Sequence, residues 1–268
     1  MAERKVALLI PVYNDQEGLE ETLAHLPGEI PLDVVVVDDG SQPPITLPQL
    51  PPPHRAFLLR LDGNRGITGA LNEGLRFVLA RGYPYVARLE ARDVALPGRF
   101  AKQLRFLEEH PEYALVGGQA RFVDPTGRET HRERFPTEDG EIRRVMHARN
   151  PFLHPAVTLR TEALRAVGLY SERYPAAEDY ELFFRLVKGF KVANLDEPVV
   201  EVLVNPEGIS GKKRRRQLLT RLRILLENFD PGLKESWLGL LKNGALFFTP
   251  TPLVGWLKRR LPGRRGWL

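Results

Sequence analysis

The chain of 268 residues contains no cysteine. Disulfide bonds, cysteine-ligated zinc and iron–sulfur clusters are therefore excluded. Long hydrophobic runs are also missing. The apolar run Val6–Ile10 is too short for a signal-peptide core, and no uncharged run reaches the roughly 18 residues of a membrane span. The lack of cysteine fits a reducing compartment, so we expect a cytoplasmic protein.

Several sequence fingerprints of enzymes are absent as well. There is no G-x-G-x-x-G after the first apolar run, no G-x-x-x-x-G-K-[ST] and no G-x-S-x-G. These absences disfavour a dinucleotide oxidoreductase, a phosphate-loop nucleotide hydrolase and a serine hydrolase. No recognised nucleic-acid-binding motif is present either, so we expect no nucleic-acid partner.

The net charge of +5 is unevenly distributed along the chain. Residues 205–268 hold 14 Lys and Arg against 4 Asp and Glu, which gives +10, whereas residues 1–204 carry a net charge of −5. Hydrophobic and charged contents of 43% and 27% are ordinary for a globular protein. A basic tail on a mildly acidic body suggests that the tail meets something anionic.

Strand and helix patterns alternate over the first ~118 residues, which is typical of a doubly wound, mainly parallel α/β sheet. The expected strands lie at 6–10, 32–37, 57–61, 85–89 and 115–117, with helices at 16–26, 64–81 and 98–109 between them. Four consecutive valines at 34–37 indicate a strand covered on both faces. Farther on, we expect a hairpin turn at 124–127, helices at 142–148 and 178–188, and strands at 156–159, 190–194 and 199–204.

The tail has a different character from the body. We expect an arginine-rich helix at 211–227 and an apolar helix at 237–248, followed by a segment with clustered arginines and tryptophans. Such a composition suits a helix lying in a membrane interface, here an anionic membrane contacted through residues 212–268. Packing on the domain, or on a second copy of the chain as a homodimer, is the alternative. The predicted organisation is a domain at 1–210 and a helical extension at 211–268.

Polar motifs stand in order at the expected strand ends. Ligands of open parallel sheets bind beyond the carboxyl ends of the strands, so these motifs mark a candidate site. They are Pro11-Val12-Tyr13-Asn14, Asp38-Asp39-Gly40-Ser41, the glycine- and asparagine-containing stretch 64–74, Glu90-Ala91-Arg92-Asp93 and Glu178-Asp179. Each motif alone is weak. As an ordered set, covering about residues 4–210, they resemble the family 2 inverting glycosyltransferases of GT-A fold.

The resemblance implies a nucleotide site. Tyr13 matches the aromatic residue that stacks on the donor's base, and Asp39 matches the carboxylate that accepts the base's imide N–H. Asp38 either contacts the nucleotide or braces the loop. The glycines of the stretch 64–74 would let the backbone approach the nucleotide, with helix N-terminal amides facing its phosphates. The further nucleotide-binding residues that we expect are Pro11, Asn14, Asn64, Gly66, Asn72, Glu90 and Arg92.

The resemblance also implies catalytic residues. Asp179 matches the general base that takes the proton of the acceptor hydroxyl. Glu178 would raise the pKa of Asp179 by like charge. Helix capping is the alternative role for this acidic pair. His154 matches a histidine on the acceptor side, and a purely structural histidine is the alternative.

Four positions depart from the family pattern: Glu90, Arg92, Leu71 and Asn205. The family usually has D-A-D-D where this chain has Glu90-Ala91-Arg92-Asp93. Asp93 could still ligate Mg²⁺ or Mn²⁺, but Arg92 puts a fixed positive charge at the usual metal position and could replace the ion. Leu71 stands where many relatives have a phosphate-facing arginine, and Asn205 where many have a histidine. The resemblance therefore implies a divalent cation and these residues put it in doubt.

The implied function is transfer of a sugar, with inversion, from a UDP- or dTDP-linked donor to a hydroxyl of a glycan or lipid-linked acceptor. We expect this in cell-envelope or exopolysaccharide synthesis, at the inner face of the membrane. Two alternatives are a catalytically inactive nucleotide-sugar-binding or scaffold protein and a nucleotidyltransferase. The latter is disfavoured because Pro-Val-Tyr-Asn occupies the place of its glycine-rich basic loop.

Overall fold

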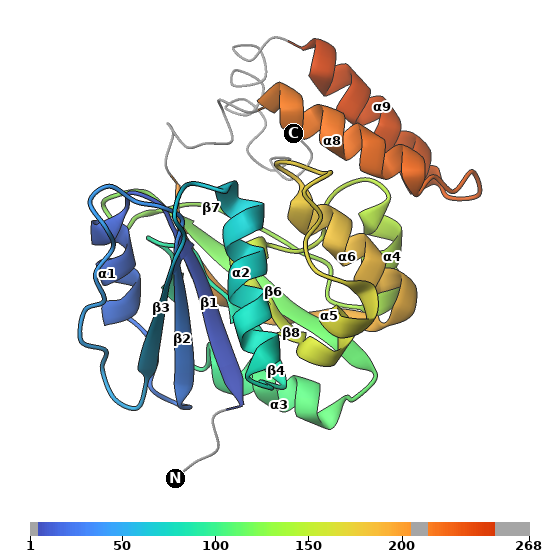
Figure 1. The fold of residues 1–268 in the computed structure, drawn as a ribbon. Coiled ribbons are helices and arrows are strands. Elements are labelled where there is room, and N and C mark those ends of the chain that lie inside the picture. Colours follow the sequence, from blue (N-terminus) through green and yellow to red (C-terminus); the bar gives the residue numbers. More distant parts are fainter. Residues whose placement is uncertain (1–4, 205–213, 250–268) are drawn as a thin grey trace.

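A computed structural model of the chain describes residues 5–204 and 214–249 (Figure 1). The strands are β1 Val6–Val12, β2 Leu32–Asp38, β3 Arg55–Arg60, β4 Tyr85–Arg88, β5 Val94–Ala95, β6 Tyr113–Val123, β7 Glu129–Glu133, β8 Thr158–Arg160 and β9 Lys191–Leu203. The helices are α1 Gln16–Ala24, α2 Gly66–Ala80, α3 Arg99–Glu109, α4 Asp139–Met146, η1 His154–Ala156, α5 Thr161–Val167, α6 Glu178–Gly189, α8 Arg214–Glu227 and α9 Lys234–Phe248. The expected α/β class is confirmed.

One sheet runs through the molecule in the order β3-β2-β1-β4-β8-β6-β9-β5, with β7 beside β6. Its first four strands are parallel, in a register that sets Val12 of β1 opposite Asp38 of β2. The strand β8 is antiparallel to its neighbours β4 and β6, and β6 and β9 pair in parallel. The carboxyl ends of the parallel strands therefore share one edge of the sheet, at the top in Figure 1.

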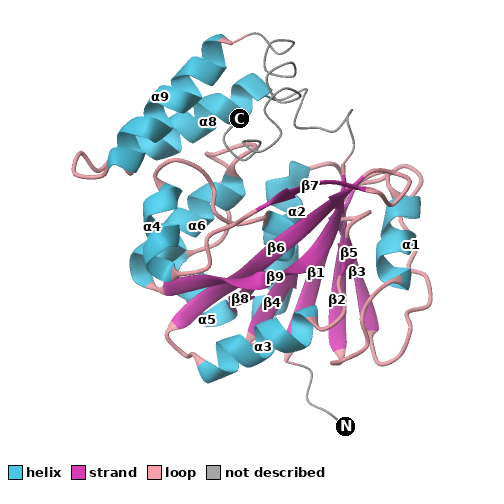
Figure 2. Ribbon diagram, turned by 180° about the vertical axis from the view of Figure 1, so that it is seen from behind, coloured by secondary structure: helices cyan, strands magenta, loops and turns pink. Residues whose placement is uncertain are grey.

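Both faces of the sheet are covered by helices (Figures 1 and 2). Successive residues of a strand point to opposite faces. Accordingly Ala7 and Leu9 join the buried cluster formed with α2, α4, α5 and α6, whereas Leu8 and Ile10 join the cluster formed with α1 and α3. Two-sided burial explains why β1 and β2 read as continuous apolar runs.

The region after residue 118 differs most from expectation. The two strands expected at 190–194 and 199–204 are one long strand, β9, paired along β6. Gly118 pairs with Leu195 and Gln119 with Pro198, so a bulge at 196–197 absorbs the polar residues that interrupt the pattern. The short β5 and the helix α5 were not predicted from the sequence.

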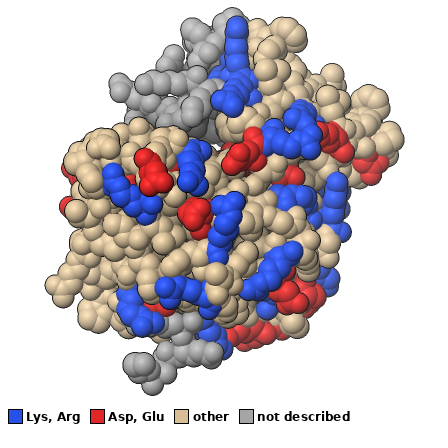
Figure 3. All heavy atoms as spheres, in the orientation of Figure 1, with Lys and Arg blue, Asp and Glu red and all other residues tan. Residues whose placement is uncertain are grey.

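The two C-terminal helices form a hairpin above the domain (Figure 1). Ile224 and Leu225 of α8 belong to the same buried cluster as Phe183 and Phe184 of α6. The helix α9 packs on α8, and its side of the hairpin is largely free of charged side chains in Figure 3. None of the helices in the described ranges combines the length and hydropathy needed to cross a bilayer.

Candidate active site

The loops after β1 and β2 are fastened to each other by Asn14. Its backbone N–H donates to Ser41 Oγ at 2.8 Å, and its Oδ1 accepts from the Gln42 N–H at 2.8 Å. Asn14 has φ +53°, a left-handed conformation that Asn tolerates better than most residues. The neighbouring Tyr13 is 50% exposed. A ring in this position has a face available for stacking.

The two aspartates after β2 have different surroundings. The Asp38 side chain is fully buried and accepts from Ser41 N–H at 2.8 Å, Ile45 N–H at 3.2 Å and Arg60 Nη1 at 2.9 Å. It braces the loop and has no exposed surface for a ligand, which favours the bracing role over nucleotide contact. Asp39 accepts the Arg65 N–H at 2.7 Å, and burial raises its pKa. Asp39 thus ties β2 to the start of α2.

The start of α2 holds Gly66 at φ +72°, where its N–H donates to Asn64 Oδ1 at 3.1 Å. Asn72 is buried one turn and a half farther along. Its amide donates to Tyr170 O at 2.9 Å and accepts the Tyr170 N–H at 3.0 Å. Both ends of this side chain are therefore used in holding the loop before α6, and the expected nucleotide contact is replaced by a structural one.

Two further positions of the sequence pattern also lie inside the protein. Pro11 is a buried residue of β1 rather than of the loop after it. Leu71 belongs to the buried cluster between α2 and the sheet, so this departure from the family leaves an apolar contact instead of a basic group. Asn205 lies outside the described residues.

Glu90 follows β4 and lies beside a buried arginine. Arg88 Nη2 is 3.7 Å from Glu90 Oε1, and the Arg88 guanidinium also donates to Leu9 O at 2.7 Å and to Leu89 O at 3.0 Å. The Glu90 side chain is 46% exposed, so its carboxylate has the buried Arg88 on one side and solvent on the other. Loss of hydration raises the pKa of Glu90; the Arg88 charge opposes this and the Asp179 charge adds to it.

His154 is buried behind Glu90. Arg88 Nε donates to its Nε2 at 3.4 Å, and Tyr170 OH lies 2.8 Å from the same nitrogen. An Nε2 that accepts from Arg88 leaves the ring proton on Nδ1, which lies 3.9 Å from Glu90 Oε1. Burial and the Arg88 charge lower the pKa of His154 well below its usual value. The structure therefore places a neutral His154 beside Glu90.

Arg92 turns toward α1. Its backbone has φ +75°, and its N–H donates to Gly18 O at 3.0 Å. The guanidinium donates to both oxygens of Asp15, through Nε at 2.9 Å and Nη2 at 2.5 Å. Asp15 also caps α1. The guanidinium of Arg92, which could have bound a diphosphate through two hydrogen bonds, is thus occupied by the Asp15 carboxylate.

Asp93 is only 5% exposed. Burial and the charge of Glu90 raise its pKa well above the usual value, which favours the neutral acid. In residues 5–204 and 214–249, no three His, Asp or Glu side chains are arranged to hold a metal ion. Sequence reasoning thus identified an acidic strand end, and the structure does not gather its carboxylates into a ligand set there.

Glu178 and Asp179 form the first turn of α6. Burial raises the pKa of Asp179, while the Tyr180 amide and the Arg221 charge lower it. Burial and then the charge of Asp179 raise the pKa of Glu178 to about 7. The Asp179 charge thus raises the pKa of Glu178, whereas the sequence analysis expected Glu178 to raise that of Asp179.

The sequence analysis missed two residues that act on Asp179. Asn150 Nδ2 donates to Asp179 Oδ2 at 2.9 Å and fixes the carboxylate. Arg221 comes from α8, the first helix after residues 205–213, and α8 is held against the loop before α6 by Thr220 Oγ1, which donates to Pro175 O at 2.9 Å. No motif marks either residue, because both reach Asp179 only through tertiary packing.

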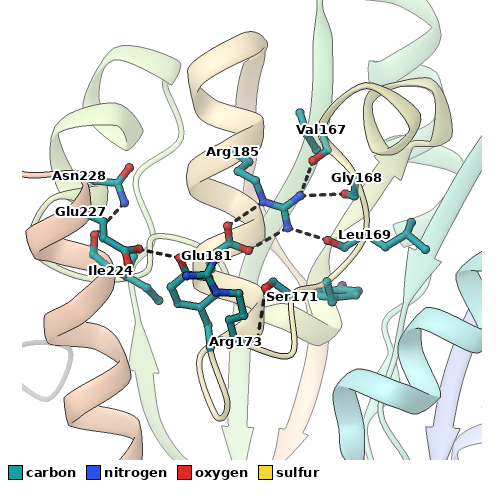
Figure 4. Close-up of polar contacts among 12 residues, drawn as sticks. Val167, Gly168, Leu169, Ser171, Arg173, Glu181, Arg185, Ile224, Glu227 and Asn228 are labelled. Atoms are coloured by element: carbon teal, nitrogen blue, oxygen red, sulfur yellow. Dashed lines mark hydrogen bonds and ion pairs between the residues drawn. The ribbon is translucent and has the colours of Figure 1, made fainter.

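The loop that leads into α6 is held from behind by Arg185 (Figure 4). Its guanidinium donates to the carbonyls of Val167, Gly168 and Leu169, the last at 2.7 Å. It also pairs with Glu181 on its own helix at 2.8 Å. The first turn of α6, with Asp179, is thereby set relative to the end of α5.

The chain matches the sequence model described as Glycosyl transferase family 2 over residues 7–168. The amylovoran biosynthesis glycosyltransferase AmsE of Erwinia amylovora is 29% identical over 267 residues, which cover 96% of this chain and 94% of that protein. An uncharacterized glycosyltransferase of Haemophilus influenzae is 32% identical over 202 residues, covering 74% of this chain and 73% of its own length.

Solved structures show the same fold. TarS of S. aureus in complex with UDP-GlcNAc superposes with a TM-score of 0.64 at 17% identity, covering 91% of this chain and 73% of that one. A mannosyltransferase, PcManGT from Pyrobaculum calidifontis, in complex with GDP-Man and Mn2+, gives 0.63 at 17% identity, covering 99% and 83%. The GT-A fold expected from the sequence is confirmed.

Proposed function

The chain belongs to glycosyl transferase family 2 and is a glycosyltransferase of glycan synthesis, and from this premise we propose that it moves a sugar, with inversion, from a nucleoside-diphosphate donor to an acceptor hydroxyl. The observation that carries the proposal is the position of Asp179. This carboxylate lies in the first turn of α6 and is fixed by Asn150. Burial raises the pKa of Glu90, and the Asp179 charge adds to that rise.

In the proposed reaction, Asp179 accepts the proton of the acceptor hydroxyl while that oxygen attacks the anomeric carbon. The bond from the anomeric carbon to the diphosphate oxygen breaks on the opposite face, and its electron pair leaves with the diphosphate. Burial that raises the pKa of a carboxylate makes it a better general base, so the enclosed position of Asp179 supports this role.

We place the donor's nucleoside at the ends of β1 and β2. The exposed ring of Tyr13 offers a stacking face, and Asp39 is a carboxylate that can accept an imide N–H of uracil or thymine, which supports a UDP- or dTDP-sugar. Glu90 would contact the ribose or the sugar between this end and Asp179. The N-terminus of α2, beside the exposed Arg65, supplies positive potential for the diphosphate.

A divalent cation would offset the diphosphate charge, and PcManGT was solved with Mn2+. The described residues of this chain do not fit such an ion: Arg92 is committed to Asp15, and Asp93 is buried with a raised pKa. The proposed reaction therefore contains no step that depends on a metal ion. Titration of EDTA into the transfer assay tests this point. Retained turnover is the expected result, and complete loss restored by Mn²⁺ would show that an ion is required.

The function is tested by donor hydrolysis with a panel of UDP-, dTDP- and GDP-sugars. Asp179→Asn should lower the rate by about 10²-fold or more while leaving nucleotide binding intact in a thermal-shift assay. Asp196→Asn, at an exposed aspartate in the β9 bulge, is the matched control. Nucleotide binding without any turnover of the wild type would favour the inactive scaffold, an alternative supported by the occupied Arg92 and the apolar Leu71.

The acceptor that we propose is a growing glycan, lipid-linked or free. Support comes from the relative named for amylovoran biosynthesis, which covers nearly the whole chain. We further propose that the enzyme works at the inner face of a membrane, where the basic residues of 212–268 would meet anionic lipid.

A further inference from the structure

One face of α9 is left uncovered in the described part of the chain. The opposite face is anchored: Ser236 Oγ lies 3.1 Å from His147 Nδ1, and Gly239 is buried against the backbone of His147 and Ala148. Asn243 is buried on the same side. The orientation of the helix about its own axis is therefore fixed by packing on the domain.

The outward face carries large apolar side chains. Trp237 is 53% exposed, Leu238 45%, Leu241 69% and Phe248 83%. Trp237, Leu241 and Phe248 follow at intervals of four and seven residues, so they form one stripe along the helix. Two more exposed leucines, Leu219 and Leu226, lie on α8. Most of the exposed large apolar residues of the described chain are thus gathered on this hairpin.

Charge decides which partner this stripe fits. Residues 205–268 carry a net charge of +10, and Arg215, Arg216 and Lys234 are exposed on the hairpin itself. A second copy docking hairpin to hairpin would bring two strongly positive segments together. An anionic lipid surface offers the opposite charge together with an apolar layer for tryptophan, leucine and phenylalanine.

We propose that the outward face of α9 docks this protein on an anionic lipid surface, with Trp237, Leu241 and Phe248 inserted at the interface. The hairpin stands at the same end of the molecule as the carboxyl ends of the parallel strands and the start of α6 (Figure 1). Docking through α9 therefore holds the candidate site near the surface. That this placement brings the candidate site close to a lipid-linked acceptor rests on the proposed function. The docking of α9 on lipid does not depend on the proposed function.

The first test is flotation of the full chain with vesicles of phosphatidylcholine, with and without phosphatidylglycerol. We expect recovery with anionic vesicles that falls as salt is raised. The double variant Leu241→Gln with Phe248→Gln should weaken recovery about tenfold or more, because both side chains lose their apolar insertion. Leu58→Gln with Ile67→Gln, at exposed positions on the body, should bind like the wild type.

The second test places Trp237 directly. With Trp256 and Trp267 changed to Phe, the fluorescence of Trp237 should shift to shorter wavelength on anionic vesicles. No shift, or equal flotation of the wild type and the Leu241/Phe248 variant, would overturn the proposal. So would a wild-type dimer that the same variant converts to monomer, because a second copy would then cover the face.

The variant also separates this inference from the proposed function. Hydrolysis of a soluble donor should be unchanged in the Leu241/Phe248 variant, because neither residue lies in the candidate site. Lipid binding without donor hydrolysis would remove the proposed function alone, and hydrolysis without lipid binding would remove the docking alone. Unchanged thermal unfolding of the variant shows that the body remains folded.

Discussion

At the scale of single residues, Glu178 combines burial with a carboxyl oxygen that lacks a hydrogen-bond partner in the described part of the chain. It is 7% exposed, and its Oε2 has no hydrogen-bond partner in the described residues. Its pKa of about 7 lies far above the ordinary 4.5. The folded protein therefore holds this proton more tightly than the unfolded chain between about pH 4.5 and 7. The stability that Glu178 contributes is lost as pH rises through this window.

Glu178→Gln should consequently stabilise the protein at alkaline pH. The amide carries no charge to bury, so we expect the free energy of unfolding at pH 8.5 to exceed the wild-type value by up to about 3 kcal/mol. At pH 5 the two proteins should be nearly equal, since wild-type Glu178 is then protonated. Urea unfolding at both pH values measures this, with Glu172→Gln as the exposed control. A difference independent of pH would contradict it.

Arg221 shows how a distant residue can set the chemistry of Asp179. Its positive charge lowers the pKa of that carboxyl and so keeps the base ionised at lower pH. Arg221→Gln should raise the pKa of Asp179. The acid limb of the kcat/KM profile would then move to higher pH while the rate at its plateau changes little.

The pH–rate profile of donor hydrolysis measures this effect, and Arg216→Gln, on the outward side of the same helix, is the matched control. An acid limb that moves equally in both variants would mean that the overall charge of α8, rather than Arg221, acts on Asp179.

At the scale of elements, local patterns predict what local contacts determine. The apolar runs of β1, β2 and β4 and the start of α6 could be predicted from the sequence because burial on both faces and helix-start acids leave direct traces. The edge strand β5 could not, since its two residues pair with β9 more than a hundred positions away. Asn72 and Asp38 were expected to contact the nucleotide because of their positions in the sequence. Position alone does not show that the hydrogen-bonding groups of a side chain are already used by other parts of the protein.

The same limit applies to the loop that sets α6. Arg185 sits in a helical run of the sequence, and only the structure shows it donating to three successive carbonyls (Figure 4). Arg185→Gln should cost about 2–3 kcal/mol, because acceptors of a packed turn lose their donor and Glu181 loses its partner. Arg223→Gln removes an exposed pair that is screened by solvent and should cost clearly less. Urea unfolding compares the two variants, and equal losses would mean that the Arg185 contacts stabilise the protein no more than the exposed Arg223 pair does.

At the scale of the whole molecule, the question is whether the body folds without the C-terminal hairpin. The sequence predicted a domain ending near residue 210. The structure gives α8 three buried apolar residues, Leu218, Ile224 and Leu225, and the latter two belong to the cluster around α6. In contrast, the residues that α9 buries are the small or polar Ser236, Gly239 and Asn243. The two helices should therefore contribute very differently to the stability of the body.

Two truncations distinguish these contributions. A chain ending at residue 213 loses α8 and α9, and we expect it to unfold with a free energy lower by about 5 kcal/mol, from about 1.5–3 kcal/mol for each buried leucine or isoleucine. A chain ending at residue 232 keeps α8 and should lose much less, because the residues that α9 buries are small or polar. Urea unfolding and binding of a hydrophobic dye compare the two. If the chain ending at residue 213 unfolded at the wild-type midpoint, the hairpin would contribute nothing to the stability of the body. A large loss of stability in that chain alone would make α8 part of the catalytic domain. That result would agree with the effect of Arg221, a residue of α8, on Asp179.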